Sequence, residues 1–216
     1  MTAATLMLVH GWGFDASVWT GLAARMPERS FLSLDLGFLG APARPAPTGE
    51  SPVVAIGHST GLLWLLHERP FVWDALISIN GFPRFVSGDG YAPAVEPRVL
   101  DRMLSRFDRD PHAVTADFLH RCGHAAPPAV LNVPALREGL EWLRRWDARD
   151  SLARERSPLL ALAGEADPIV PPPMTRAAFE GRGRVRWSGT GGHLLPLSDP
   201  DWCAREIRAF LTERAL

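Results

Sequence analysis

The sequence predicts a fold of the α/β class, with a mostly parallel sheet, helices on both faces and a helical insertion. In the first third of the chain, short apolar runs alternate with helical segments, which is typical of parallel strands joined by right-handed crossovers. The alternation stops near residue 82 and resumes near residue 158, and the block between is helical and arginine-rich. We therefore expect one core formed by residues 1–81 and 158–216, with a helical cap, residues 82–157, inserted in it.

Each strand is expected where an apolar run is bounded by turn-forming residues. The expected strands are residues 5–9, 31–35, 52–56, 75–79, 158–163 and 184–187. Helices are expected over residues 15–24, 60–68 and 201–211 of the core and over residues 97–109 of the cap. Because the cap follows the fourth strand, we expect it above the carboxyl ends of the strands, where open α/β sheets bind ligands.

Composition excludes several classes of protein. A net charge of −1 over 216 residues argues against a nucleic-acid partner, and no apolar run approaches the ~20 residues of a membrane span. The start of the chain, MTAATLMLVHGWG, lacks the basic region and cleavage site of a secretory signal. The two cysteines, Cys122 and Cys203, are far apart and lack metal-ligand spacing. We expect a cytoplasmic monomer with reduced thiols, no cofactor, no metal, and neither a nucleic-acid nor a membrane partner.

The run GHSTG, residues 57–61, follows an expected strand and precedes an expected helix. In this context Gly-x-Ser-x-Gly forms a sharp turn that presents its serine above the sheet. The glycines avoid collisions between neighbouring side chains, and the start of the helix favours an adjacent oxyanion. We predict that Ser59 is a nucleophile on an exposed turn; the alternative is a glycine-rich turn without a catalytic role.

A serine hydroxyl needs a base to remove its proton. The candidate base is His193, in the glycine-rich loop 189–193 between the last expected strand and the last helix. The alternative is a surface histidine in a flexible loop. Of the other histidines, His10 and His58 lie within the glycine motifs, and His112, His120 and His124 lie in the cap.

The base in turn needs a third group to orient it. Asp167, in the run GEADPIVP, lies where a loop leaves the carboxyl end of an expected strand. An aspartate before proline is also a common turn former or helix cap. Glu165 is the nearest alternative acid, and Asp89 is a weaker one.

Nucleophilic attack on a carbonyl also requires two N–H groups that stabilise the developing oxyanion. One is expected from Thr60, the residue after the nucleophile. The run HGWG, residues 10–13, ends the first expected strand and can supply the other, most naturally from the N–H of Trp12. The alternative for HGWG is a simple glycine turn.

Four motifs in this order resemble the α/β-hydrolase superfamily, and more narrowly the pimeloyl-acyl-carrier-protein methyl ester esterases of biotin synthesis. They are LVHGWGFDASVW (8–19), GHSTG (57–61), GEADPIVP (164–171) and GGH (191–193). The chain order Ser59, Asp167, His193 is also that of α/β-hydrolases. The resemblance implies a serine carboxylesterase that works through an acyl-enzyme, with a pimeloyl-carrier-protein methyl ester as the favoured substrate and no cofactor.

The chain also departs from this family. It starts at what corresponds to the family's third strand, so we expect a shortened N-terminus. Residues 36–47 are too short and proline-rich for the usual helix, and His58 stands where the biotin esterases carry tryptophan. Other readings therefore stay open: a general short-chain or lipase-like esterase, a C–C bond hydrolase of the same fold, or a binding protein without turnover.

Arginines of the cap offer a possible contact with an acidic carrier protein. Arg102, Arg106 and Arg109 follow the spacing i, i+4, i+7 and should share one face of a helix. Arg137 and Arg144 lie along one edge of a later helix. Guanidinium groups pair well with carboxylates and phosphate, so these residues could receive such a carrier. The alternative is a set of solvated faces on amphipathic helices.

Overall fold

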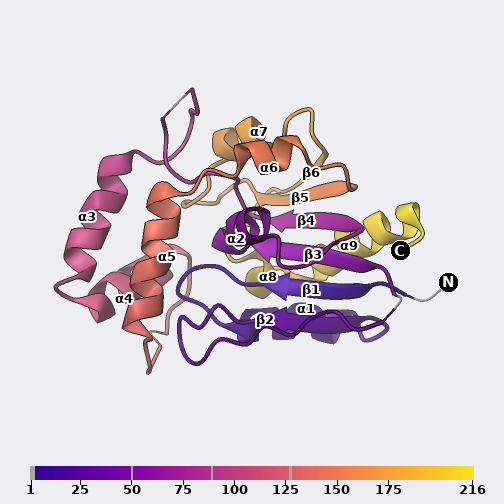
Figure 1. The fold of residues 1–216 in the computed structure, drawn as a ribbon, viewed down its shortest axis with the longest axis horizontal. Helices are drawn as coiled ribbons and strands as arrows, with labels where there is room; N and C mark the ends of the chain where they lie inside the picture. The colour runs from indigo at the N-terminus through magenta and orange to yellow at the C-terminus, as the bar shows by residue number, and fades with distance from the viewer. Residues whose placement is uncertain (1–2, 50, 89, 127) are drawn as a thin grey trace.

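The computed structural model describes residues 3–49, 51–88, 90–126 and 128–216. Within them, six parallel strands form one sheet in the order β2-β1-β3-β4-β5-β6 (Figure 1). The strands are β1 (Thr5–Val9), β2 (Ser30–Leu34), β3 (Val53–His58), β4 (Ala75–Ile79), β5 (Leu159–Gly164) and β6 (Arg184–Ser188). The predicted α/β fold is confirmed, and each strand begins within one residue of its expected start.

Helices cover both faces of the sheet (Figure 1). One face carries α2 (Thr60–Glu68), α6 (Arg149–Ala153) and α7 (Pro172–Phe179). The other carries α1 (Thr20–Arg25), α8 (Leu195–Ser198) and α9 (Pro200–Arg214), and the short 3-10 helix η1 (Ala16–Trp19) precedes α1. No helix of the described residues is both long and apolar enough to cross a membrane.

The central strands consist mainly of apolar residues, which favours burial of both faces of the sheet under helices. Every residue of β4 and β5 is buried, as parallel strands between two helical layers require. The edge strand β6 instead alternates exposed and half-buried residues over most of its length. The carboxyl ends of β3, β4 and β5 therefore form a rigid edge on which side chains can be held.

Three cap helices stand beyond this edge, while the two chain termini lie at the other end of the molecule (Figure 1). They are α3 (Pro97–Phe107), α4 (Pro111–Arg121) and α5 (Val133–Arg145), and α3 packs against both of the others. The indole of Trp12 donates a hydrogen bond of 2.7 Å to the carbonyl of Leu136, which joins α5 to the loop after β1. The last helix of segment 82–157, α6, packs beside α2.

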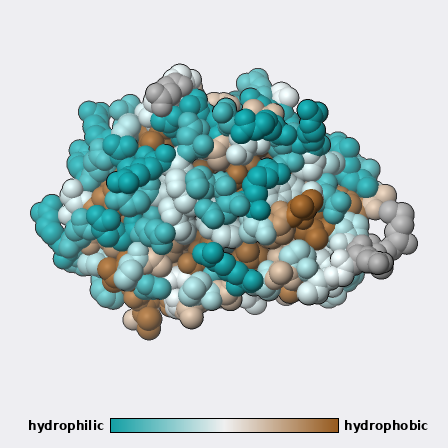
Figure 2. Space-filling view, viewed as in Figure 1, coloured by the Kyte–Doolittle hydropathy of each residue, from teal (hydrophilic) through white to brown (hydrophobic). Residues whose placement is uncertain are grey.

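The segment between β2 and β3 forms no helix in its described residues, as its proline content predicted. Asp35 and Ala43 exchange two backbone hydrogen bonds, of 2.7 and 3.0 Å, which fold this segment back on itself. Figure 2 shows a largely hydrophilic face with scattered hydrophobic residues. Among the described residues, the exposed large hydrophobic side chains include Val130 in the cap and Leu197 in α8.

Candidate active site

The turn from β3 into α2 holds Ser59 in a backbone conformation that is rare outside glycine, with φ of 53°. The neighbouring glycines are required sterically: a Cβ on Gly57 would lie 2.5 Å from the nitrogen of Leu62, and one on Gly61 would overlap the carbonyl of Val9. The N–H of Ser59 donates to the carbonyl of Ile79 over 3.0 Å, which fixes the turn against β4. The local sequence therefore forces the sharp corner that the motif predicts.

The structure brings Ser59, His193 and Asp167 together. His193 Nε2 lies 3.0 Å from Ser59 Oγ, and His193 Nδ1 lies 2.8 Å from Asp167 Oδ2. Because a carboxylate can only accept, Nδ1 carries the hydrogen and Nε2 presents its lone pair to the serine hydroxyl. This is the tautomer that a general base needs.

The site differs from the sequence expectation in one respect: the serine is not exposed. Ser59 and Asp167 each keep 3% of their surface exposed, and His193 keeps 1%. The glycines correctly predict the sharp turn, but not the burial of the serine that it holds.

Glu165, His10, His112 and His120 do not take part in these contacts. Glu165 is exposed, and Asp89 lies outside the described residues. His10 is buried but holds the chain after β2, because its Nε2 accepts a hydrogen bond of 2.9 Å from the N–H of Leu36. In the cap, His112 and His120 are exposed.

The proposed oxyanion donors flank Ser59. Among the described residues, neither the main-chain N–H of Trp12 nor that of Thr60 donates to another group of the chain. The loop after β1 passes close to Ser59, since a Cβ on Gly11 would lie 3.1 Å from Ser59 Cβ. Both N–H groups are thus available to a ligand, which is what an oxyanion hole requires.

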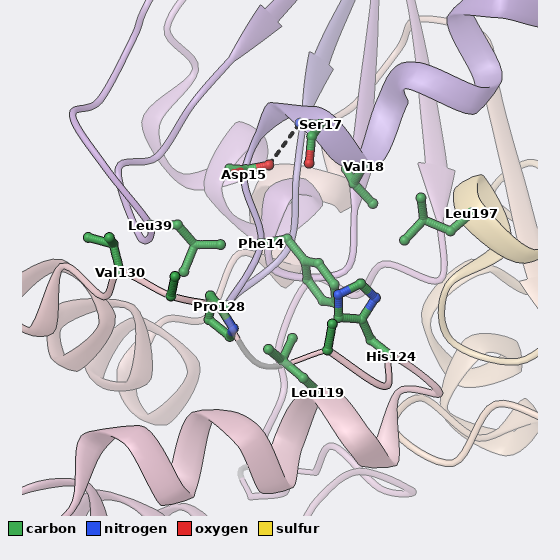
Figure 3. Close-up of a pocket in the computed structure, with 13 residues that line it drawn as sticks. Phe14, Asp15, Ser17, Val18, Leu39, Leu119, His124, Pro128, Val130 and Leu197 are labelled. Atoms are coloured by element: carbon green, nitrogen blue, oxygen red, sulfur yellow. Dashed lines mark hydrogen bonds between the residues drawn. The ribbon is translucent and has the colours of Figure 1, made fainter.

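A mostly apolar cavity of about 410 Å³ lies between the segment after β1 and the end of α4 with the loop that follows it (Figure 3). Its described lining includes Phe14, Val18, Leu39, Leu119, Val130 and Leu197, together with the polar Asp15, Ser17 and His124, and contains no arginine. Figure 3 shows Phe14 and His124 together in its wall, with ring centroids 5.8 Å apart. The ring of Phe14 also packs against that of His58, which precedes Ser59, so this cavity lies next to the turn that holds Ser59.

A second cavity, of about 370 Å³, shares His124 and Leu197 with the first. Its described lining also includes Gly192 and Leu194, the two neighbours of His193. The two cavities therefore meet along the seam between the cap and α8, at His124 and Leu197.

Most cap arginines that the sequence placed on free faces are paired within the cap. Arg106 pairs with Asp117 over 2.7 Å, and these residues come from α3 and α4. Ion pairs also join Arg137 to Asp108 and Glu141 and Arg144 to Asp101. The predicted helix 97–109 ends at Phe107, so Arg109 lies in the turn after α3 and not on its face. Arg102 and Arg109 are exposed, and no ion pair of theirs is found among the described residues.

Sequence reasoning missed one residue of the site, Asn80, and assigned no role to another, His58. Both donate hydrogen bonds to the carbonyl of His193. The sequence did hold one indication of Asn80, because it is a polar residue directly after β4, and β4 pairs with β3.

The described residues hold no cluster of side chains suited to a metal ion, and both cysteines are buried.

No protein-family model matches the chain. Among curated proteins, the chain is 29% identical to the pimeloyl-[acyl-carrier protein] methyl ester esterase of Klebsiella pneumoniae, over 77% of this chain and 76% of that protein. It is 28% identical to the protein of the same name from Xanthomonas campestris, over 95% of this chain and 94% of the relative. These similarities confirm the resemblance to this group of esterases that the motifs indicated.

Solved structures show the same fold. The esterase from Exiguobacterium antarcticum superposes with a TM-score of 0.83 at 17% identity, covering 98% of this chain and 92% of that one. The bromoperoxidase from Bacillus anthracis superposes with a TM-score of 0.80 at 16% identity and the same coverage. The fold is that of the α/β-hydrolases.

Proposed function

We propose that this chain, a carboxylic ester hydrolase, cleaves the methyl ester of pimeloyl-acyl-carrier protein through a serine acyl-enzyme. The observation that carries the mechanism is the buried series of contacts from Asp167 through His193 to Ser59. In such a water-poor site, fixed dipoles stabilise developing charge more strongly than in solution.

In the proposed reaction, Ser59 Oγ attacks the ester carbonyl while His193 Nε2 takes its proton. The N–H groups of Trp12 and Thr60 donate to the oxyanion of the tetrahedral intermediate. As this intermediate collapses, His193 protonates the departing methanol. A water molecule, deprotonated by His193, then attacks the acyl-enzyme, and His193 returns this proton to Ser59 Oγ as the carboxylic acid leaves. Asp167 keeps the imidazole oriented and stabilises its cationic form throughout.

The apolar cavity supports an uncharged acyl chain as the substrate. A pimeloyl chain whose far carboxyl is a thioester carries no charge at either end. Free monomethyl pimelate would instead bring a carboxylate into a described lining without an arginine, at a desolvation cost. We therefore propose that the enzyme prefers the carrier-linked ester. The acyl chain enters along the seam between the cap and α8, at His124 and Leu197. The carrier protein then contacts the cap beside Arg102 and Arg109.

A general short-chain esterase is the second candidate, and one observation favours it. Arg106, Arg137 and Arg144 already have acidic partners inside the cap, so fewer cations remain for a carrier protein than their spacing suggested. No comparable observation favours a C–C bond hydrolase or a binding protein without turnover.

The test compares kcat/KM for three esters: the carrier-linked methyl ester, free monomethyl pimelate and p-nitrophenyl acetate. The proposal expects the carrier-linked ester to be the best substrate and monomethyl pimelate the poorest. Equal values for the carrier-linked and p-nitrophenyl esters would favour the general esterase. Labelling by a fluorophosphonate probe, lost in Ser59→Ala, separates all of these enzymes from a binding protein.

A further inference from the structure

The main-chain carbonyl of His193 accepts hydrogen bonds from two side chains at neighbouring strand ends. His58, the last residue of β3, donates through Nε2 over 2.9 Å. Asn80, directly after β4, donates through Nδ2 over 2.8 Å. Both side chains are buried. Two donors on one buried carbonyl hold the backbone of the residue whose imidazole faces Ser59.

Asn80 also connects the loop of the base with the loop of the acid. Its Nδ2 donates to the carbonyl of Gly192 over 2.9 Å, and its Oδ1 accepts from the N–H of Gly164 over 2.9 Å. Gly164 ends β5, three residues before Asp167. Asn80 has a φ of 48°, a conformation that asparagine tolerates better than most residues. One amide thus spans the ends of β4 and β5 and the loop of His193.

His58 contributes a neutral donor. A carbonyl oxygen can only accept, so Nε2 carries the hydrogen and Nδ1 keeps a lone pair, which has no partner among the described residues. Burial, and secondarily the charge of His193, lowers the pKa of His58 to about 3. A neutral ring matters here because a cation would oppose the imidazolium that forms on His193, whose ring centroid is 5.1 Å away.

We propose that His58 and Asn80 are positioning residues: together they hold the main chain of His193 so that its imidazole stays aligned between Asp167 and Ser59. The inference rests on the proposed role of His193 as the base. Without one donor, the carbonyl keeps a single side-chain bond and loop 189–193 can shift. A displacement of about 1 Å at a reacting group can cost about 100-fold in rate.

The first test measures kcat and KM for p-nitrophenyl acetate. His58→Leu removes the donor at similar volume, and Asn80→Gly removes the amide while keeping the backbone conformation. We expect kcat to fall about 10- to 100-fold in each with KM nearly unchanged. His58→Gln, which retains an N–H near the position of Nε2, should recover most of the loss. Exposed His67→Leu is the matched control and should behave as the unmodified enzyme.

The second test uses NMR to measure the alignment of the His193 imidazole directly. The downfield proton resonance of His193 Nδ1–H should be sharp in the unmodified protein and in His58→Gln, and broadened or shifted in His58→Leu and Asn80→Gly. ¹⁵N spectra of the unmodified protein should show His58 neutral and protonated on Nε2 from pH 5 to 9, because its pKa is about 3. This measurement needs no variant, so it remains decisive if a substitution prevents folding.

The proposal is overturned if His58 is charged or protonated on Nδ1 in that range. It is also overturned if both variants lower Tm while kcat and the downfield resonance stay as in the unmodified protein. Ser59→Ala separates this inference from the proposed function. If Ser59→Ala keeps full turnover, the hydrolase mechanism fails, and the NMR spectra still report whether the two side chains order His193.

Discussion

Asp167 and His193 meet through a hydrogen bond of 2.8 Å in a place where solvent reaches almost none of either side chain. The second carboxylate oxygen of Asp167 is already occupied, since it accepts from the N–H groups of Ile169 and Val170 over 2.7 and 2.9 Å. The carboxylate therefore cannot rotate freely, and Oδ2 stays directed at the imidazole. This arrangement makes orientation of His193 the expected role of Asp167.

Asp167→Asn should preserve the fold but allow the amide to donate to His193 Nδ1, which would stabilise the wrong tautomer. We expect kcat for p-nitrophenyl acetate to fall by roughly four orders of magnitude, as in other serine triads. The matched control is Glu165→Gln, a change at an exposed neighbour, which should reduce kcat far less. The reverse order of severity would transfer the role of the acid to Glu165.

Leu119→Ala should alter chain-length preference. Leu119 is buried and projects from α4 into the apolar cavity (Figure 3), so its truncation adds room for the acyl chain. We expect kcat/KM for p-nitrophenyl octanoate to rise severalfold relative to the acetate, although the lost packing costs about 2–5 kcal/mol of stability. Leu100→Ala, in α3, is the control: it should destabilise similarly without changing the ratio, because Leu100 is buried but is not part of that lining. An unchanged ratio in Leu119→Ala would exclude this cavity from substrate binding.

Local patterns predicted the strands and the sharp turn at Ser59 because their causes are local. Apolar runs are buried wherever a parallel strand lies between helical layers, and Gly57 and Gly61 are required by atoms of the turn and of the adjacent strand. The grouping of Ser59, Asp167 and His193 could also be predicted, since each of them follows an expected strand and their chain order is that of α/β-hydrolases.

What the sequence did not reveal depends on distances between segments far apart in the chain. The role of Asn80 arises from contacts with Gly164 and His193, 84 and 113 positions later. Helical spacing indicates which face of its own helix carries Arg106 or Arg144. It does not indicate their ion-pair partners, Asp117 and Asp101, which lie on other helices. Periodicity within one helix carries no information on which helix packs beside it.

Asp147 should make stability depend on pH at the base of the cap. It pairs with Arg84 and Arg149 over 2.7 Å each, and the hydrogen bond from Arg149 is the main cause that lowers its pKa to about 2. A lowered folded-state pKa stabilises the protein above the unfolded value, and this stabilisation is lost as the pH falls through about 2.

Asp147→Asn should therefore reduce the free energy of unfolding at pH 7 by about 1 kcal/mol or less, since a third of the Asp147 side chain is exposed. Urea titrations should show the difference between the two proteins shrinking from about pH 4 and vanishing only below pH 2. Asp150→Asn, at a much more exposed site on α6, should change stability little at any pH. A difference that is as large near pH 2 as at pH 7 would mean that the substitution acts through something other than the carboxylate charge.

The carrier-protein proposal now rests on Arg102 and Arg109, the exposed arginines of the proposed contact for which no ion pair is found among the described residues. Arg102→Glu with Arg109→Glu should repel an acidic carrier and lower kcat/KM for the carrier-linked methyl ester, by about tenfold at low salt. The loss should shrink as salt rises, because rim charges act mainly on the encounter rate. A free p-nitrophenyl ester does not meet this surface, so its turnover should barely change.

Arg137→Glu, in the same cap, is the variant with which the Arg102 and Arg109 double variant is compared. Its guanidinium pairs with Asp108 and Glu141, so reversal of its charge disrupts contacts inside the cap. We expect it to lower Tm and to affect both esters alike. If the Arg102 and Arg109 double variant behaves in the same way, its effect is destabilisation and not docking. If it changes turnover of neither ester, the two arginines are solvated surface residues without a docking role, and the enzyme belongs with the general short-chain esterases.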